Sequence, residues 1–295
     1  MLNYLVLIRE RFNPLEYIPM IVVFVLANGL AFSPAPGQDP TQNWVVAFLL
    51  ALSFFLRLRF FDEIKDYETD LKLNPHRPLA RGAISISEVK TGIFWLLVFE
   101  ISLCLFLDPR MLLTHALAIG FSLLMYSEFF IGDFLRPKLT TYAVTHTFSS
   151  VLIALSVTCA VTGLSPLEIT RSQLLFLLMN WAFFNLFEFA RKTFAPMEER
   201  DSVPSYSKIF TPAGAVLLSW SQGILGVFLI WYSLRDYAFV EQARLMWPAA
   251  TLMVYILLSS LFMFKPLLST ARIFRLGSGV YLLSHYVVLI LVLAR

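Results

Sequence analysis

Three aspartates recur every four residues in the segment RLRFFDEIKDYETDLKLNPHRPLARG, residues 57–82: Asp62, Asp66 and Asp70. On an α-helix this spacing turns each carboxylate about 40° from the last and advances it about 6 Å, so the three share one stripe. Carboxylates placed this way repel one another unless a cation lies between them. Mg²⁺ prefers oxygen ligands and is usually bound by one or two carboxylates together with substrate phosphates. The stripe therefore predicts a magnesium site.

The same charges also fit a solvated helix end, in which Lys65 and Lys72 pair with the acids. That interpretation would be the better one on an ordinary soluble helix. Here the segment follows directly on an apolar block, and ionisable groups at the rim of a membrane are costly and tend to be functional. We therefore favour the metal site.

The residues after the stripe predict a constrained basic loop. Asn74-Pro75 should end the helix, because the residue before proline is pushed out of the α region. Arg77 and Arg81 then project from a stretch interrupted by Pro78 and Gly82. A guanidinium suits a pair of phosphate oxygens, so Arg77 is a candidate diphosphate ligand. Anchoring to the membrane surface is the alternative, and Arg81 fits it equally well.

The composition places these residues in a membrane protein. Of the 295 residues, 58% are hydrophobic and 15% charged, too little charge to cover a soluble domain of this size. Crossing a bilayer takes about 20 mostly apolar residues. Nine such blocks lie near residues 17–33, 43–60, 91–107, 111–131, 140–162, 172–188, 213–233, 246–264 and 276–294. We therefore expect an all-α bundle of nine transmembrane helices and a single domain covering residues 1–295.

The placement of Lys and Arg predicts the orientation. With a cytoplasmic N-terminus and alternating spans, 18 of the 23 basic residues fall inside. The remainder are Arg110, Arg171, Arg235, Arg244 and Arg295, and the first outer loop, SPAPGQDPTQN, has none. The C-terminus then lies on the opposite side. The two long inner loops, 57–90 and 188–210, predict a central cavity open to the cytoplasm. A net charge of +3 is too small to imply a nucleic-acid partner, and the apolar blocks make the lipid bilayer the expected surroundings.

An aspartate stripe at the end of a second membrane helix, followed by Asn-Pro-x-Arg-Pro-Leu-x-x-Gly, resembles the UbiA superfamily of intramembrane prenyltransferases. The family pattern is Asn-Asp-x-x-x-Asp-x-x-x-Asp, and Phe61 stands here in place of the Asn. The resemblance implies one UbiA-like domain with a nine-helix fold, Mg²⁺ as cofactor and an isoprenyl diphosphate as substrate. It also makes Asp62 and Asp66 the catalytic pair, with all three aspartates as metal ligands.

The second charged segment departs from the family, which usually has a second Asp-x-x-x-Asp after the sixth span. Here the sequence is NLFEFARKTFAPMEERDSVPSYSK, with Glu188 where an acid is expected and Lys192 four residues on. In one interpretation Glu188, with Glu198 or Glu199, binds a second Mg²⁺. In the other, Arg191 and Lys192 offset the diphosphate charge directly. We prefer a mixture, with Glu188 a catalytic metal ligand and Lys192 a phosphate contact.

The resemblance implies further site residues. Lys138, after the fourth span, is expected at the diphosphate. Once diphosphate leaves, the allyl cation needs protection from water, and aromatic faces attract cations by about 0.5–2 kcal/mol each. Candidates for this role lie near the same helix ends: Tyr67, Tyr126, Trp181, Phe184 and Tyr206.

The expected reaction is transfer of the prenyl group to an acceptor, whose identity the sequence does not define. The main alternative is a UbiA-type terpene cyclase, a lyase in which the substrate's own double bond captures the cation. A cation transporter is a more distant alternative, because transporters place their sites near the midplane of the bilayer rather than at its rim.

Overall fold

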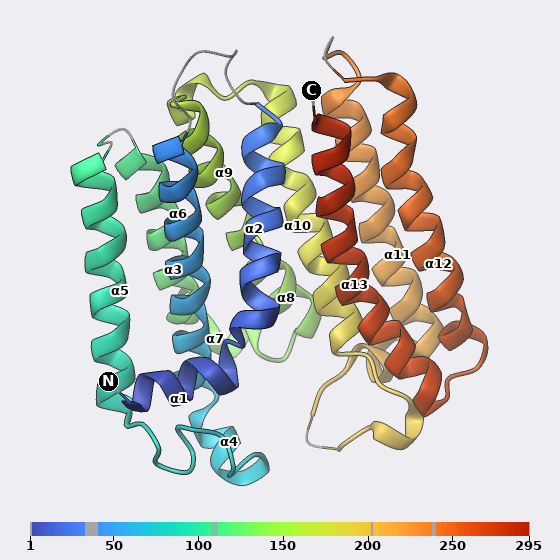
Figure 1. The fold of residues 1–295 in the computed structure, drawn as a ribbon. Helices are drawn as coiled ribbons and strands as arrows, with labels where there is room; N and C mark the ends of the chain where they lie inside the picture. Colours follow the sequence, from blue (N-terminus) through green and yellow to red (C-terminus); the bar gives the residue numbers. More distant parts are fainter. Residues whose placement is uncertain are drawn as a thin grey trace. The chain divides into compact units, whose positions relative to one another are not determined.

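The computed structural model describes residues 2–32, 41–107, 109, 111–201, 203–237 and 240–294, and within these ranges every regular element is a helix (Figure 1). The chain divides into two compact units. The first comprises Met1–Gly29, Ser33–Phe130 and Leu155–Leu167, and the second Leu30–Phe32, Ile131–Ala154 and Glu168–Arg295. Each unit is described by itself.

The first unit contains the aspartate segment. Its helices are α1 (Leu2–Arg11), α2 (Pro14–Leu30), α3 (Thr41–Lys65), α4 (Tyr67–Leu73), α5 (Ile86–Leu107), α6 (Met111–Tyr126) and the short η1 (Glu128–Phe130), with the second half of α9 (Ser149–Thr162). α3 packs against both α5 and α6, and α5 against α6. α4 ends at Leu73, as the Asn74-Pro75 pair predicts.

A small apolar cluster ties the N-terminal helix to the aspartate segment. Its buried members come from α1, the end of α3, the loop after α4 and the start of α5: Leu7, Phe60, Leu79, Ile84 and Val89. α1 meets α2 at an angle of 70°. α1 lies against the end of α3 and the loop after α4, where Leu7 packs with Phe60 and Leu79.

The second unit contains the other charged segment. Its helices are α7 (Gly132–Leu135), α8 (Leu139–Thr147), the first part of α9, α10 (Arg171–Arg191), η3 (Pro196–Glu198), α11 (Tyr206–Leu234), η4 (Gln242–Met246), α12 (Trp247–Phe264) and α13 (Leu268–Leu293). Each of α10 to α13 packs against the next, and α13 also packs against α10, which gives a four-helix arrangement. A Cβ atom at Gly226 of α11 would lie 2.4 Å from the Phe183 ring, so this close approach requires glycine.

The membrane spans agree in part with the nine predicted blocks. Within the described residues, seven helical segments are long and apolar enough to cross a bilayer: Trp44–Lys65, Ile86–Phe106, Leu139–Thr162, Arg171–Arg191, Tyr206–Leu234, Gln242–Phe264 and Leu268–Leu293. The bent pair α1–α2 is an eighth candidate, and α6, at 16 residues, falls short of the usual length. The chain is thus a multi-pass membrane protein, and nine crossings stay a prediction. Most of the loop 33–43, with Arg110 and Arg295, lies outside the described residues.

Candidate active site

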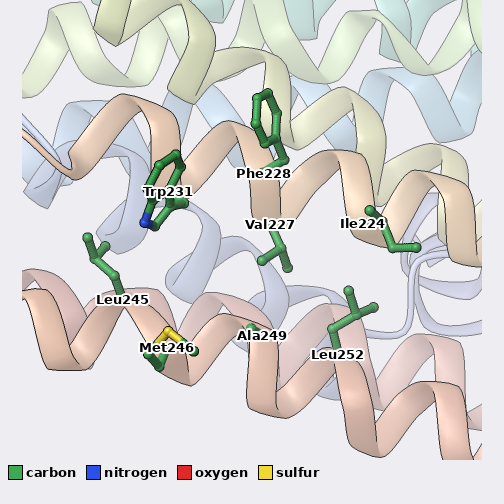
Figure 2. A pocket seen from close by; sticks show the side chains of 8 residues that line it. All are labelled: Ile224, Val227, Phe228, Trp231, Leu245, Met246, Ala249 and Leu252. Atoms are coloured by element: carbon green, nitrogen blue, oxygen red, sulfur yellow. The ribbon is translucent and has the colours of Figure 1, made fainter.

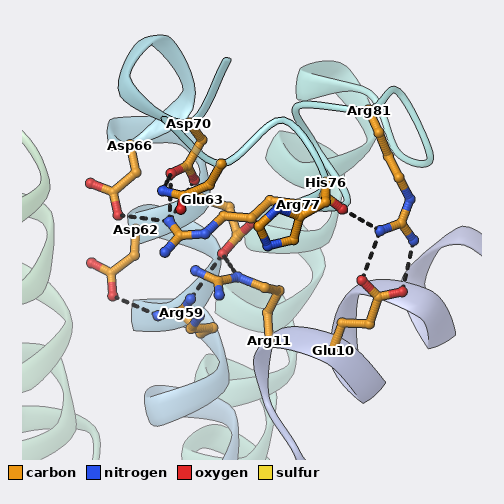
Figure 3. A network of polar contacts seen from close by, with 11 residues as sticks. Glu10, Arg11, Arg59, Asp62, Glu63, Asp66, Asp70, His76, Arg77 and Arg81 are labelled. Carbon is orange, nitrogen blue, oxygen red and sulfur yellow. Dashed lines mark hydrogen bonds and ion pairs between the residues drawn. The ribbon is translucent and has the colours of Figure 1, made fainter. Parts of the chain in front are cut away.

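The first aspartate segment keeps the helical register that the sequence predicts. Although α3 ends at Lys65 and α4 begins at Tyr67, the backbone N–H of Asp66 donates to the Asp62 carbonyl, and that of Asp70 to the Asp66 carbonyl, both at 2.8 Å. These i to i+4 bonds place the aspartates along one stripe. Figure 3 shows the carboxylates of Asp62 and Asp66 pointing to the same side, one above the other, at the end of α3.

The three carboxylates differ in their surroundings. The side chains of Asp62 and Asp66 are each 55% exposed, whereas that of Asp70 is 5% exposed. Arg77 donates from Nη1 to both oxygens of Asp70, at 2.6 and 2.7 Å, and the Asn74 amide donates to one of them at 2.9 Å. The nearest Asp66 oxygen is 3.9 Å from Arg77. A metal-ligand role for Asp70 stays a prediction, and it would require Arg77 to move.

The loop that carries Arg77 is folded by its own backbone and by α1. The Arg77 N–H donates to the Asn74 carbonyl at 3.0 Å and the Arg81 N–H to the Arg77 carbonyl at 2.9 Å. Gly82 then takes a φ of 76°, which glycine adopts without steric cost. Arg81 pairs with Glu10 of α1 at 2.7 Å (Figure 3). Arg81 therefore joins the loop to α1, while Arg77 faces the aspartate stripe.

A second charge cluster lies beside the stripe. The Glu63 side chain is 1% exposed and accepts from Arg11 Nε at 2.6 Å and from Arg59 Nη2 at 3.1 Å. Arg59 also lies 3.6 Å from an Asp62 oxygen, a longer ion pair. Through these ion pairs Glu63 connects α1 to α3. The acids that face outward are Asp62 and Asp66 (Figure 3).

The donor set suits Mg²⁺ that is completed by other ligands. Across the described parts of the chain, no three His, Cys, Asp or Glu side chains gather closely enough to hold a metal ion by themselves. Two exposed carboxylates one helical turn apart nonetheless match the usual protein contribution to a Mg²⁺ site, in which water and substrate phosphates supply the remaining oxygens. Asp62 and Asp66 are the residues that would hold the ion.

Three contacts, spaced one helical turn apart on the neighbouring face of α3, fix the stripe against the residues of α6 and η1. The pairs are Arg57 Nη1 with Ser122 Oγ at 2.5 Å, the Phe61 and Tyr126 rings at 4.6 Å, and Lys65 Nζ with Glu128 Oε1 at 3.5 Å. Arg57, Phe61 and Lys65 thus lie on the face of α3 that contacts α6 and η1. Asp62 and Asp66 lie on a different face. Phe61, at the family's Asn position, supplies an aromatic partner for Tyr126.

The last of these contacts holds an unusual turn. Glu128, Phe129 and Phe130 have φ values of 51°, 53° and 57°, a left-handed conformation that costs roughly 1–2 kcal/mol per residue without glycine. The Glu128 carboxylate is paired with Lys65, and the Phe129 ring packs 5.3 Å from that of Phe121. These contacts offset the strain of the turn at the end of the first unit.

A fully buried charge network lies deeper in the first unit. Arg57 and Glu100 form a bidentate pair at 2.9 and 3.0 Å, and both side chains are 0% exposed. His115 Nε2 donates to Glu100 at 3.1 Å, and its Nδ1 lies 2.9 Å from the Ser156 hydroxyl. Buried ion pairs persist when further hydrogen bonds satisfy them. This network was not predicted from the sequence, although Glu100 and His115 each interrupt an apolar block, which is a signal of a buried polar site.

In the second unit, Glu188 is bound by the two basic residues that follow it. Arg191 donates to one carboxylate oxygen, and Lys192 Nζ lies 3.0 Å from the other. Glu188 is 12% exposed, Lys192 29% and Arg191 50%. Lys192 ends α10 as its C-cap residue. Glu188 and Lys192 thus form an i,i+4 ion pair, and Arg191 joins it.

The other two predicted acids are tied to different partners. Glu198 forms a bidentate pair with Arg275 of α13 at 2.7 and 2.9 Å, and this hydrogen bonding holds the pKa of Glu198 below its usual range. Glu199 accepts from the hydroxyls of Ser205, at 2.8 Å, and Ser207, at 2.5 Å. The two acids organise the loop between α10 and α11, and a metal role for either stays a prediction.

The remaining predicted residues occupy varied surroundings. Lys138 Nζ lies 3.1 Å from the centre of the Phe134 ring, a cation–π contact. The Trp181 indole donates to the Val144 carbonyl at 2.8 Å, and the ring of Phe184 is partly buried. Tyr206 is fully buried, with its hydroxyl on the Leu139 carbonyl at 3.3 Å. In the first unit, Tyr67 packs partly buried against the apolar cluster around Phe60.

Comparison with known proteins gives a clear result for the fold. No protein-family model and no curated protein sequence matches the chain. Among solved structures, a digeranylgeranylglyceryl phosphate synthase has a TM-score of 0.67 and 18% identity, over 99% of this chain and 97% of that one.

Two archaeal structures are similar to the same degree. The apo structure of a UbiA homologue from Aeropyrum pernix K1 has a TM-score of 0.66 and 15% identity, over 92% of this chain and 98% of that one. A UbiA homologue from Archaeoglobus fulgidus bound to GPP and Mg²⁺ has a TM-score of 0.64 and 15% identity, over 97% and 99%. The likeness at such low identity lies in the fold, and this is the fold that the resemblance implies. The chain has the fold of the UbiA superfamily.

Proposed function

We propose that this chain is a Mg²⁺-dependent intramembrane enzyme that ionises an isoprenyl diphosphate and transfers the prenyl group to an acceptor. The observation that carries the proposal is the pair of exposed carboxylates, Asp62 and Asp66, one helical turn apart at the end of a membrane-spanning helix. An isoprenyl diphosphate has an apolar chain and a charged head. The chain suits the bilayer around the helix, and the head suits the charged residues at the helix end.

The likeness to solved structures supports the proposal. UbiA homologues from Archaeoglobus fulgidus have been solved with GPP or DMAPP together with Mg²⁺. These are isoprenyl diphosphates of the class proposed here. The fold is shared over nearly the whole chain. Asp62 and Asp66 offer carboxylate oxygens, which are ligands of the kind that Mg²⁺ prefers.

The chain's own residues divide the work in this proposal. Bound Mg²⁺ would neutralise the charge that develops on the departing diphosphate. Asp62 and Asp66 would hold the ion, and Arg77, adjacent to Asp66, would add a guanidinium for a phosphate oxygen. Tyr126, kept in place by Phe61, would offer a ring face to the allyl cation.

The second charged segment is proposed to act through its cations. Lys192 and Arg191 now neutralise Glu188, so they are already oriented around an anionic group. We propose Lys192 as a diphosphate contact, with Lys138 as a further one. Glu188 would then hold Lys192 in position, or bind a second ion if the lysine turns away. Trp181, Phe184 and Tyr206 stay proposed as aromatic contributors from this unit.

One observation favours terpene cyclisation as a second candidate. The segment that usually holds two aspartates has the Glu188–Lys192 ion pair instead. This replacement would change how the segment binds the diphosphate and stabilises the allyl cation, and it would leave the first metal site at Asp62 and Asp66 intact. In a cyclase, a double bond of the substrate attacks the cation, and no acceptor is required.

The proposal is tested by incubating the purified full-length protein with geranyl, farnesyl and geranylgeranyl diphosphates, with and without aromatic and lipid acceptors. We expect Mg²⁺-dependent release of diphosphate, measured by a coupled assay. A product whose mass is the sum of prenyl group and acceptor identifies a transferase, and a hydrocarbon or alcohol formed without acceptor identifies a cyclase. Binding of an isoprenyl diphosphate without any diphosphate release would contradict both.

We also propose a cytoplasmic N-terminus and a C-terminus on the opposite side. Both native cysteines, Cys104 and Cys159, are buried, so introduced cysteines can be labelled selectively. In intact cells a membrane-impermeant thiol reagent should label Asp236→Cys, between α11 and α12, and not Lys265→Cys, between α12 and α13. The reverse pattern would contradict this orientation or show that α6 does not cross the membrane.

A further inference from the structure

An apolar groove runs along the surface of the second unit between α11 and the η4–α12 segment. It has a volume of about 290 Å³. Figure 2 shows side chains from the two segments facing each other across it. Eight residues line it, all apolar: Ile224, Val227, Phe228, Trp231, Leu245, Met246, Ala249 and Leu252. The groove contributes nothing to the charged segments proposed as the active site.

The groove is open along helices that cross the bilayer. α11 and α12 are both membrane-span candidates, and the lining side chains of Phe228 and Met246 are 54% and 65% exposed. From Ile224 to Trp231 the groove extends about 10 Å along α11, at 1.5 Å per residue. Within the bilayer this groove contacts lipid hydrocarbon. A narrow groove fits one acyl chain better than the flat surface of another protein.

One end of the groove has the character of the membrane interface. Trp231 lies there, and the Arg235 guanidinium lies 5.1 Å from its ring and 4.6 Å from that of Tyr232. On the other wall, Arg244 precedes the lining residue Leu245 and lies 6.0 Å from the Trp247 ring. Trp and Tyr concentrate at the level of lipid headgroups, and arginine there meets phosphate.

The two arginines differ in their partners. Arg244 is paired with Glu241 at 2.7 Å and donates to the Ala294 carbonyl at 3.2 Å. Arg235 contacts Asp236 only through Nε, at 3.5 Å, and the Asp236 side chain is 84% exposed. Within the described part of the chain its two terminal nitrogens form no hydrogen bond, so they are available to bind a phosphate.

We propose that this groove binds one phospholipid of the surrounding bilayer, with an acyl chain along Val227, Phe228 and Ala249 and the phosphodiester at Arg235. The apolar lining would contact the acyl chain, and the Arg235 guanidinium beside Trp231 would contact the headgroup phosphate. This site is independent of the proposed catalytic function.

The test measures the binding of one phosphatidylglycerol species to delipidated, full-length protein in detergent by native mass spectrometry. Ala249→Phe fills the groove, and Arg235→Gln removes the phosphate partner; we expect each to weaken the tightest binding step about tenfold or more. Two controls should leave it unchanged: Arg171→Gln, an arginine at the start of α10, and Leu257→Phe, an exposed position on α12 outside the groove. Thermal unfolding confirms that each variant is folded.

Two further probes separate chain from headgroup. Diacylglycerol with the same chains should bind more weakly than phosphatidylglycerol to the wild type, and equally to wild type and Arg235→Gln. Glycerol phosphate, which has no acyl chain, should not compete. Unchanged phosphatidylglycerol affinity in folded Ala249→Phe, or an equal loss in the controls, would overturn the site. Equal affinity of the two lipids for the wild type would overturn the assignment of Arg235.

Discussion

Arg77 and Asp70 form a closed pair, in which one guanidinium nitrogen donates to both carboxylate oxygens at 2.6 and 2.7 Å. Both belong to the motif that resembles the UbiA pattern, and the sequence alone suggests that both face the substrate. In the structure the pair binds the loop after α4 to the end of the aspartate stripe. It distinguishes the buried Asp70 from the two exposed acids, Asp62 and Asp66.

This separation predicts different effects for neighbouring aspartates. Asp70→Asn removes the buried charge that pairs with Arg77, so we expect a loss of stability of about 1–3 kcal/mol. Turnover should stay within about tenfold, equivalent to 1.4 kcal/mol of barrier. Asp66→Asn, at an exposed position, should leave stability unchanged and abolish turnover. Thermal unfolding in detergent and diphosphate release measure the two effects. Loss of turnover in Asp70→Asn at unchanged stability would instead make Asp70 a direct metal ligand.

The Glu188–Lys192 pair predicts a binding effect. If Lys192 contacts diphosphate, Lys192→Ala should weaken substrate binding about tenfold to a hundredfold, because hydrogen bonds to charged groups contribute roughly 1.5–3 kcal/mol. Lys192→Asp restores the family's acid and should recover activity only at raised Mg²⁺. Lys265→Ala, at an exposed position between α12 and α13, is the control. Unchanged Km in both Lys192 variants would assign the lysine to pairing with Glu188, a contribution of about 0–1 kcal/mol.

The buried Arg57–Glu100 pair predicts a large stability effect. Glu100→Leu leaves the Arg57 charge buried without a partner, which should cost about 3–5 kcal/mol. The double variant Arg57→Met, Glu100→Leu should recover much of this loss, since both charges are then removed. Unfolding temperatures of the two single variants and the double variant measure the coupling. Additive losses would show that the two side chains act independently.

Features set by neighbouring residues could be read from the sequence. The four-residue spacing of Asp62, Asp66 and Asp70 specifies a helical stripe whatever the tertiary structure, and Asn74-Pro75 specifies its end. The Glu188–Lys192 pair follows from the same geometry within one helix. The apolar blocks likewise predicted the seven membrane-span helices found in the described residues, whereas the blocks on the bent α1–α2 pair and on the short α6 stay predictions as spans.

Contacts between residues that are far apart in the sequence could not be predicted from it. Glu198 is neutralised by Arg275, 77 positions away, and nothing near Glu198 distinguishes this pair from a metal ligand. The partners of Glu100 lie on other helices, and Arg77 could equally have faced solvent, phosphate or Asp70. The exposure that separates Asp62 and Asp66 from Asp70 depends on how the loop folds back. Hydrophobic patterning predicts which helices form, not which charges meet.

The central claim is that Asp62 and Asp66 together support ionisation of an isoprenyl diphosphate with Mg²⁺. Its most direct test is diphosphate release from farnesyl or geranylgeranyl diphosphate by wild type and by the Asp62→Asn, Asp66→Asn double variant, across a Mg²⁺ titration. Both side chains are exposed, so the double variant should fold with an unchanged unfolding temperature. We expect release by the wild type that EDTA abolishes and Mg²⁺ restores, and no release by the folded double variant at any Mg²⁺ concentration. Wild-type rates in that variant at saturating Mg²⁺ would contradict the account.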